Sequence, residues 1–188
     1  MGCMNYYGSK ELAASFRTVR KNTITIAEEI GEEHYGFRAA PDARTVAQLL
    51  THIALGPSLT QQIHGTDPLS TLEGFDFMSF FGKKLAEEQM PRGKKEIIDL
   101  LVEGGESFAG WLESLPDELL AEPVSFPAGM VPPSKSRFEM ILGVKEHEMH
   151  HRAQLMLMQR MIGVVPHLTR AMNARIAEMQ AAAAKASA

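Results

Sequence analysis

The sequence predicts an all-α fold, namely a four-helix bundle with a long crossover connection and short additional helices. Three observations support this prediction. Four long segments place apolar residues at helical spacing, their connections are short or rich in proline, and no segment alternates apolar and polar residues between turn signals. The 188 residues predict a single domain, with its core at about residues 9–168 and a frayed alanine-rich tail at 181–188.

The first predicted helix spans about Ser9–Glu33. Its inward positions recur in steps of three and four, at Leu12, Phe16, Val19, Thr23, Ile26 and Ile30. The second helix carries apolar residues over Val46–Ile53, and Gly56–Pro57 should end or kink it. A loop at residues 65–68 then leads to a short apolar segment, Phe75–Leu85.

The third predicted helix spans about Arg92–Leu115, and its glycine pair at 104–105 weakens it by about 1 kcal/mol per glycine. A proline-containing connection, Pro116–Pro133, leads to the fourth helix at about Ser134–Met161. Gly163 is placed to stop this helix, with Pro166 just beyond it. A shorter helix is predicted from His167 to Gln180.

Composition narrows the function classes. A net charge of −4 argues against nucleic acid or an anionic membrane as partner, and no apolar run approaches the roughly 20 residues of a membrane span. We also find no apolar stretch suited to a signal peptide at the N-terminus. Cys3 is the only cysteine, which excludes an internal disulfide and suits a reducing compartment. We therefore expect a cytoplasmic protein.

Three histidines crowd the fourth predicted helix, namely His147, His150 and His151. Residues four apart lie about 40° from each other around a helix, so His147 and His151 share one face. That face also holds Met140, Val144, Gln154, Leu155, Met158 and Ile162, so it is predicted to be buried. A histidine pair on a core face indicates either metal ligands or core side chains satisfied by hydrogen bonds.

A third ligand has to come from another helix, and His52 is the best candidate. Its face of the second helix carries small or apolar residues, namely Thr45, Leu49, Gly56 and Leu59. We expect His64, beside a glycine turn, to be exposed, His34 to lie in a loop and His167 to lie over the bundle end. Three imidazoles leave coordination positions open for water or substrate, which is typical of a catalytic metal site.

The residues His147-Glu148-x-x-His151 also match the H-E-x-x-H motif of zinc proteases. The extended motif requires glycine and histidine where this chain has Gln154 and Leu157. Such proteases also pair the substrate with a strand edge, and no strand is predicted here. The protease interpretation is therefore disfavoured.

The segments Thr45–Ile53 and His147–Leu155, with the ending Met161–Pro166, together resemble the DinB-like family. The resemblance implies a four-helix bundle, often a homodimer, in which His52, His147 and His151 bind a divalent metal, commonly zinc or nickel. It implies that His150 and Arg152 are not ligands. Three neighbours of the ligands could instead hydrogen-bond a ligand or line the pocket: His150, Gln154 and Glu148. The chain departs from many relatives at Ala153, where they have glycine.

The resemblance further implies a metal-dependent thiol S-transferase that uses a low-molecular-weight thiol and a small-molecule substrate. Two alternatives stay open, a non-catalytic metal-binding stress-response module and a metal-dependent hydrolase. Glu146 and Glu148 lie about 100° from the ligand face, so neither is an obvious general base. We assign no catalytic residue and no binding residue for an organic cofactor.

Overall fold

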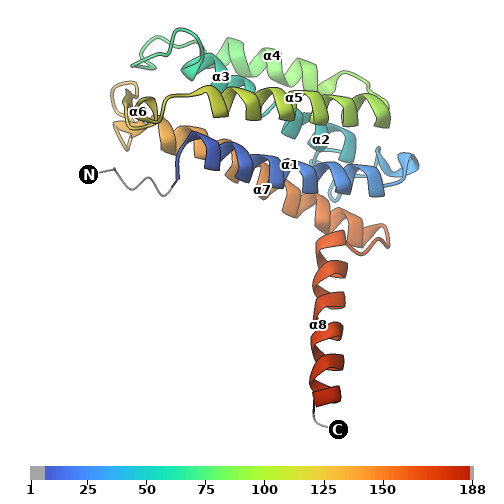
Figure 1. The fold of residues 1–188 in the computed structure, drawn as a ribbon. Coiled ribbons are helices and arrows are strands. Elements are labelled where there is room, and N and C mark those ends of the chain that lie inside the picture. Colours follow the sequence, from blue (N-terminus) through green and yellow to red (C-terminus); the bar gives the residue numbers. More distant parts are fainter. Residues whose placement is uncertain (1–6, 187–188) are drawn as a thin grey trace.

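The computed structural model describes residues 7–186, so Cys3 and the last two residues of the predicted tail lie outside the described part. Figure 1 shows the arrangement. The helices are α1 (Ser9–Glu29), α2 (Val46–Ala54), α3 (Ser58–His64), α4 (Phe77–Gln89), α5 (Lys94–Ser114), α6 (Asp117–Leu120), α7 (Arg137–Met161) and α8 (His167–Ala186), with a 3-10 turn η1 (Glu32–His34) and strands β1 (Pro123–Ser125) and β2 (Ser134–Ser136).

Four helical rods form the bundle, namely α1, α5, α7 and the broken pair α2 and α3. Helix α1 packs against α5 and α7, and α2 packs against the same two helices. Consecutive helices α1 and α2 therefore stand at diagonal corners, and residues 30–45 cross the bundle between them. The predicted all-α bundle with a long crossover is confirmed.

The two helices that carry the predicted metal ligands begin at well-defined caps. At the start of α2, Thr45 Oγ1 accepts from the Gln48 amide at 3.2 Å, and Gln48 Oε1 accepts from the Thr45 amide at 3.0 Å. Ser136 and Glu139 form the same reciprocal pair at the start of α7, at 3.2 and 3.0 Å. These capping boxes fix where each helix begins and hence which way its histidines point.

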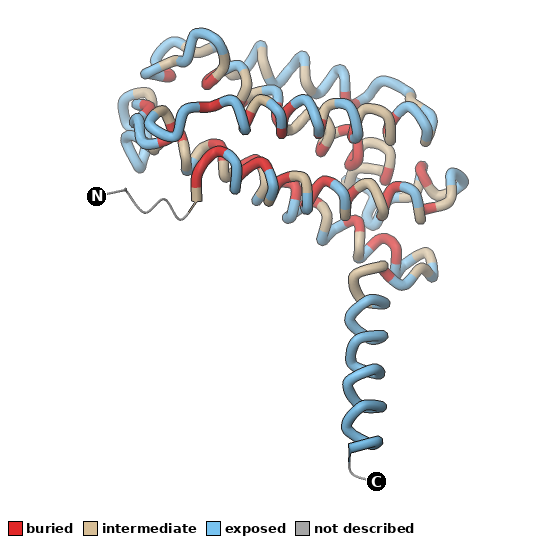
Figure 2. The backbone as a smooth tube through the Cα atoms, in the orientation of Figure 1, coloured by how far each residue is buried: buried red, intermediate tan, exposed pale blue. Residues whose placement is uncertain are grey.

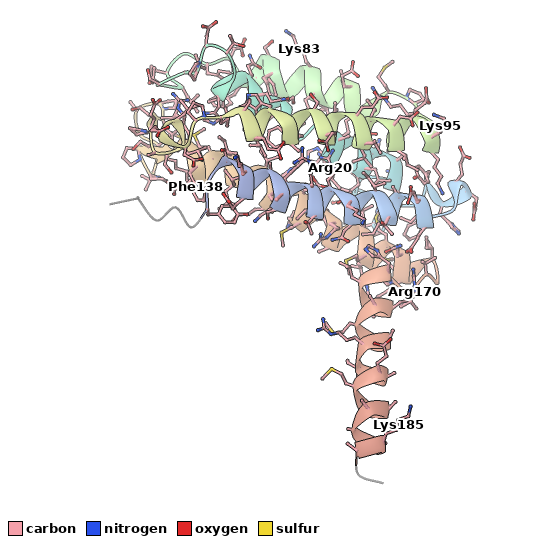
Figure 3. The ribbon with its side chains drawn as sticks, viewed as in Figure 1. Arg20, Lys83, Lys95, Phe138, Arg170 and Lys185 are labelled. Carbon is pink, nitrogen blue, oxygen red and sulfur yellow. The ribbon has the colours of Figure 1, made fainter. Side chains whose placement is uncertain are left out.

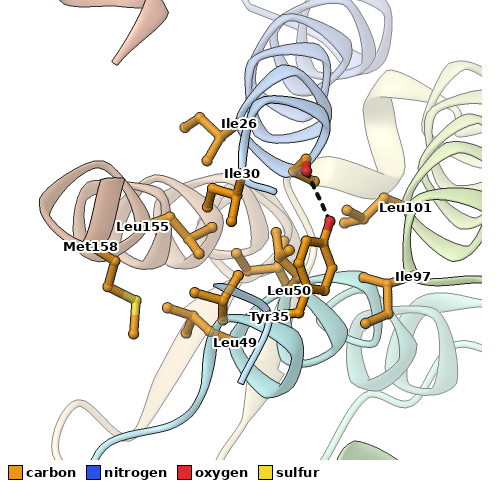
Figure 4. Close-up of a cluster of buried hydrophobic side chains, with 12 residues drawn as sticks. Ile26, Ile30, Tyr35, Leu49, Leu50, Ile97, Leu101, Leu155 and Met158 are labelled. Carbon is orange, nitrogen blue, oxygen red and sulfur yellow. Dashed lines mark hydrogen bonds between the residues drawn. The ribbon is translucent and has the colours of Figure 1, made fainter. Parts of the chain in front are cut away.

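Buried residues recur along the helices of the bundle, whereas α8 has none (Figure 2). One cluster, drawn in Figure 4, joins α1, α2, α5 and α7 through residues that are at most 6% exposed, among them Ile26, Leu50, Leu101 and Leu155. The Tyr35 hydroxyl donates to the Ala27 carbonyl at 2.8 Å and ties the crossover to α1. This cluster lies beneath the site described below.

Arg20 of α1 is buried inside the bundle at 3% exposure (Figure 3). Gly105 of α5 leaves room for it, because a Cβ at this position would lie 2.8 Å from Arg20 Cγ. A glycine that costs helix propensity thus permits a close approach of α5 to a buried guanidinium.

Helix α8 projects away from the bundle (Figure 1). Its base is held by Arg170, which pairs with Glu29 of α1. The sequence predicted an end at Gln180 followed by a frayed tail, but the helix continues to Ala186. Alanine has the highest helix propensity, which explains the extension. Among the described helices, none combines the length and apolar character needed to cross a membrane.

Several predicted boundaries were wrong. Strands β1 and β2 pair antiparallel, with Val124 opposite Lys135, whereas no sheet was predicted; strands of three residues are too short to show an alternating pattern. The first helix ends at Glu29 rather than Glu33, just before Gly31. The apolar segment that begins at Phe75 becomes α4, which extends four residues beyond the predicted end at Leu85 to Gln89.

Candidate metal centre

Three histidines from two helices meet at one point between α2 and α7. The Nε2 atom of His147 lies 3.0 Å from Nε2 of His52 and 3.1 Å from Nε2 of His151. One ligand atom from each residue lies within 4.8 Å of the others. The structure thus brings together the three residues that the sequence singled out, two of them 95 positions apart.

A buried carboxylate orients His52. Nδ1 of His52 lies 2.9 Å from Glu88 Oε2, and Glu88 on α4 is 4% exposed. The other carboxylate oxygen accepts from Arg44 Nε at 2.5 Å. A carboxylate beside the outer ring nitrogen is the arrangement that fixes the tautomer of metal-binding histidines.

An amide plays the same part at His151. Its Nδ1 lies 2.9 Å from Gln154 Oε1. The Gln154 Nε2 atom in turn lies 3.3 Å from His150 Nε2. His150 and Gln154 are both exposed. They lie beside His151, and neither contributes one of the three converging nitrogens. Gln154 thus hydrogen-bonds His151 and lines the cleft, whereas His150 is not among the lining residues and touches His151 only through its ring, with the centroids 4.9 Å apart.

These contacts determine the protonation of the rings. Carboxylate and amide oxygens only accept hydrogen bonds, so Nδ1 carries the proton in both His52 and His151. The Nε2 atoms of His52 and His151 therefore carry lone pairs, and both lie next to Nε2 of His147. Nε2 of His147 can donate a hydrogen bond to one of these lone pairs, which leaves the other without a donor. A cation at the centre would satisfy all three nitrogens.

Burial also keeps the rings neutral, which is the form that binds metal. Burial and the nearby Arg44 lower the pKa of His52 to about 4, against the opposing effect of Glu88. Burial and the neighbouring rings of His151 and His52 lower the pKa of His147 to about 3. The pKa of His151 is lowered too, chiefly by burial. Protons therefore compete weakly for this site at neutral pH.

Two of the three nitrogen separations fit a transition metal. Nitrogens bound at about 2.05 Å to a tetrahedral zinc ion lie about 3.3 Å apart, and nitrogens at right angles around an octahedral ion lie about 2.9 Å apart. The two observed separations, 3.0 and 3.1 Å, fall between these values. Within the described part of the chain, no fourth histidine, cysteine or carboxylate joins the group.

A cleft of about 690 Å³ opens beside the histidines. His151, Glu88 and Gln154 are among the residues that line it. Leu49 and Met158, each 3% exposed, line its apolar floor. This volume accommodates a small molecule next to the three converging nitrogens.

Residues 15–155 match the DinB superfamily. The chain belongs to this superfamily. No curated protein matches the sequence. Among solved structures, the DinB-like protein YjoA of Bacillus subtilis is 20% identical with a TM-score of 0.60, covering 81% of this chain and 92% of that chain.

Two further solved structures show the same fold at lower identity. YfiT of Bacillus subtilis, described as a probable metal-dependent hydrolase with an unusual four-helix bundle topology, is 14% identical with a TM-score of 0.64, covering 87% of this chain and 93% of that chain. ClbS, a colibactin self-resistance protein solved with double-stranded DNA, is 14% identical with a TM-score of 0.59, covering 81% of this chain and 96% of that one. The DNA in the ClbS structure is weakly at odds with our expectation of no nucleic-acid partner.

In this DinB-superfamily protein, the Glu148 carboxylate is enclosed in a buried ion pair with Arg20. It is 1% exposed, and its carboxylate oxygens accept from Arg20 Nε and Nη2 at 2.9–3.1 Å. Arg20 also donates to the Leu101 carbonyl at 2.9 Å. We expected Glu148 to hydrogen-bond a ligand or line the pocket, but it is not among the residues that line the cleft. The glutamate of the H-E-x-x-H pattern is a buried ion-pair partner.

The remaining histidines lie elsewhere. His64 was predicted to be exposed, but it is fully buried and its Nδ1 accepts from Arg137 Nη1 at 3.0 Å. The turn after it predicted exposure, whereas the start of α7 covers it. His34 lies in η1. His167 begins α8, where its Nε2 lies 3.1 Å from Asn22 Oδ1.

Sequence reasoning missed Glu88, Arg44 and Lys84. Glu88 lies beyond the predicted end of the apolar segment Phe75–Leu85, and one glutamate at the edge of such a segment gives no sign of burial. Lys84 is one turn before Glu88, and burial lowers its pKa. Its charge contributes to the lowered pKa of His52 and of His147, so it adds positive potential beside the site.

Proposed function

We propose that this chain is a metal-dependent enzyme in which His52, His147 and His151 hold a divalent ion, zinc or nickel. A low-molecular-weight thiol would lose its proton, form a bond from its sulfur to an electrophilic carbon of a small-molecule substrate in the cleft, and displace the leaving group from that carbon. The observation that carries the proposal is the convergence of three neutral imidazole nitrogens beside an open cleft, with no fourth protein ligand in the described residues. An open three-histidine set is typical of catalytic rather than structural sites.

The ion would lower the pKa of a thiol or a water that reaches it, so that the nucleophile is an anion near neutral pH. The residues of the chain supply position and charge. Glu88 and Gln154 hold His52 and His151 in the tautomer that presents Nε2. Leu49 and Met158 exclude water from one wall of the cleft.

Neither of the two buried glutamates near the histidines is free to act as a base, which favours a thiol over water. Glu148 is locked by Arg20, and Glu88 is engaged by His52 and Arg44. A thiol ionises at a pKa of about 8.5 even when free, so it needs less assistance than water. Transfer to an electrophile then proceeds without a carboxylate general base.

Hydrolysis is the second candidate, because YfiT, which shares the fold, is described as a probable metal-dependent hydrolase. A small molecule is favoured over DNA as the substrate, since the chain carries a net charge of −4. A non-catalytic metal-binding role is the third outcome that the test below separates.

The test compares zinc-loaded, nickel-loaded and metal-stripped protein in two assays. We expect metal-dependent loss of thiol with monochlorobimane, and its disappearance in His147→Ala but not in His34→Ala. Equal thiol loss with and without metal would refute the transferase proposal. Turnover of an activated ester with no thiol present would favour the hydrolase. Stoichiometric metal with silence in both assays would favour the non-catalytic role.

A further inference from the structure

Two chemically different sets of side chains line the cleft beside the histidines. Arg38 and Arg44 are cationic, whereas Leu85 and Leu157 are apolar. The proposed function uses only the part of this cleft at the histidines, of which His151 is a lining residue. The two sets therefore bear on which substrates the cleft can select.

Arg38 and Arg44 have N–H groups that are not engaged in hydrogen bonds within residues 7–186. Arg38 is exposed, and its one hydrogen bond within the described residues runs from Nη1 to the Pro41 carbonyl at 3.3 Å. Arg44 binds Glu88 through Nε, and no hydrogen bond of its two Nη atoms is recorded among the described residues. A guanidinium with open N–H groups binds a carboxylate or phosphate by charge-assisted hydrogen bonds.

The carboxylates near the cleft do not cancel its positive charge. Of the two that line the cleft, Glu88 pairs with Arg44, so these two charges offset each other. Asp42 is exposed, and within residues 7–186 no ion pair joins it to Arg38. Lys84 adds a positive charge near the histidines. Arg38 and Lys84 therefore exceed the single charge of Asp42, so the field in the cleft favours an anion, and a bound dication would strengthen it.

Two exposed leucines offer apolar contact. Leu85 of α4 is 53% exposed and Leu157 of α7 is 56% exposed, and both line the cleft together with the buried Met158. Large exposed leucines that border a concave site are the usual contacts for the apolar part of a ligand.

We propose that the cleft selects molecules that join an anionic group to an apolar body, with Arg38 and Arg44 on the anion and Leu85 and Leu157 against the body. The proposal deepens the proposed function, since it assigns the substrate class of the same site. It does not depend on the nucleophile, because these four side chains belong to the protein alone.

The test uses matched probes that differ in a single group. Binding of 6-mercaptohexanoate and 6-mercaptohexanol to the full chain is followed by amide chemical shifts in NMR spectra, with and without bound cobalt(II). We expect the carboxylate to bind about two- to fivefold more tightly, the range given by a solvent-exposed ion pair. Arg38→Gln should remove most of that preference, while Arg175→Gln on the exposed surface of α8 should leave it intact.

A second pair of probes tests the contact with Leu85 and Leu157. Compared with 3-mercaptopropionate, 6-mercaptohexanoate has three more methylene groups and should bind several-fold more tightly if the leucines contact them. Equal affinity of carboxylate and alcohol, a preference that survives Arg38→Gln, or no gain from chain length would overturn the inference. In the cobalt-loaded protein, a sulfur-to-cobalt charge-transfer band reports separately on the thiol proposal. Its absence would refute that function while the carboxylate preference is still judged from the shifts.

Discussion

Glu88 gives the sharpest test of how the site is built. Its carboxylate is 3% exposed, lies 2.9 Å from Nδ1 of His52 and also accepts from Arg44. Glu88→Gln keeps the shape and one acceptor oxygen but removes the charge that holds the His52 proton in place. Loss of such a partner of a metal-binding histidine typically weakens metal affinity 10- to 100-fold, or about 1.4–2.7 kcal/mol.

Zinc affinity is measured by competition with a chromophoric chelator, and circular dichroism verifies that each variant is folded. Glu87→Gln is the matched control, because Glu87 is adjacent in sequence but its side chain is 60% exposed and pairs with Arg92. We expect Glu87→Gln to bind zinc like the wild type. If Glu88→Gln also binds zinc like the wild type, Glu88 does not position His52 for a metal and the account of the site is wrong.

Four further predictions follow from other contacts. Glu148→Ala leaves the Arg20 charge buried without its partner and should cost about 3–5 kcal/mol in urea unfolding, whereas Glu146→Ala on the exposed face should cost little; equal costs would contradict the buried pair. Gly105→Ala should destabilise the fold because its Cβ meets Arg20 at 2.8 Å, whereas Gly110→Ala in the same helix meets nothing within 4 Å and should stabilise it by up to about 1 kcal/mol; the same sign for both would refute the steric argument. Burial lowers the pKa of His52 and His64 from 6.5 to about 4, so the unfolded chain binds more protons than the folded chain between pH 4 and 6.5. The metal-free protein should therefore lose stability as the pH falls from 6.5 to about 4. An unfolding midpoint that stays constant across this range would contradict it. The homodimer implied by the family resemblance predicts a sedimentation mass of twice 20.7 kDa, and a monomer mass at tens of micromolar would contradict it.

Helical spacing was enough to predict the convergence of the histidines. His147 and His151 share a face that also carries Leu155 and Met158, and both of these residues are buried. His52 faces inward because its helix begins at the Thr45 cap with apolar positions on the same side. Local periodicity therefore predicted both halves of the site, because the apolar face of an amphipathic helix packs toward the core of a bundle.

Long-range pairing could not be predicted in the same way. Glu88 is buried because α4 lies across α2, and nothing within α4 specifies that contact. Arg20 and Glu148 are 128 residues apart, and each by itself suggests a solvated surface charge. His64 next to Gly65 suggested exposure, but the Arg137 side chain covers it. A polar residue can be buried only where the fold places a hydrogen-bond or ion-pair partner beside it. A single sequence does not show which distant residue that partner is.

Metal content tests the central claim most directly. The untagged chain, purified without nickel resin, is analysed for metals by mass spectrometry beside His52→Ala, His147→Ala, His151→Ala and His150→Ala. We expect about one divalent ion per wild-type chain, loss of most of it in the first three variants, and retention in His150→Ala. A metal-free wild type that also fails to take up added zinc or nickel, or a metal content that the first three changes leave intact, would contradict the three-histidine site.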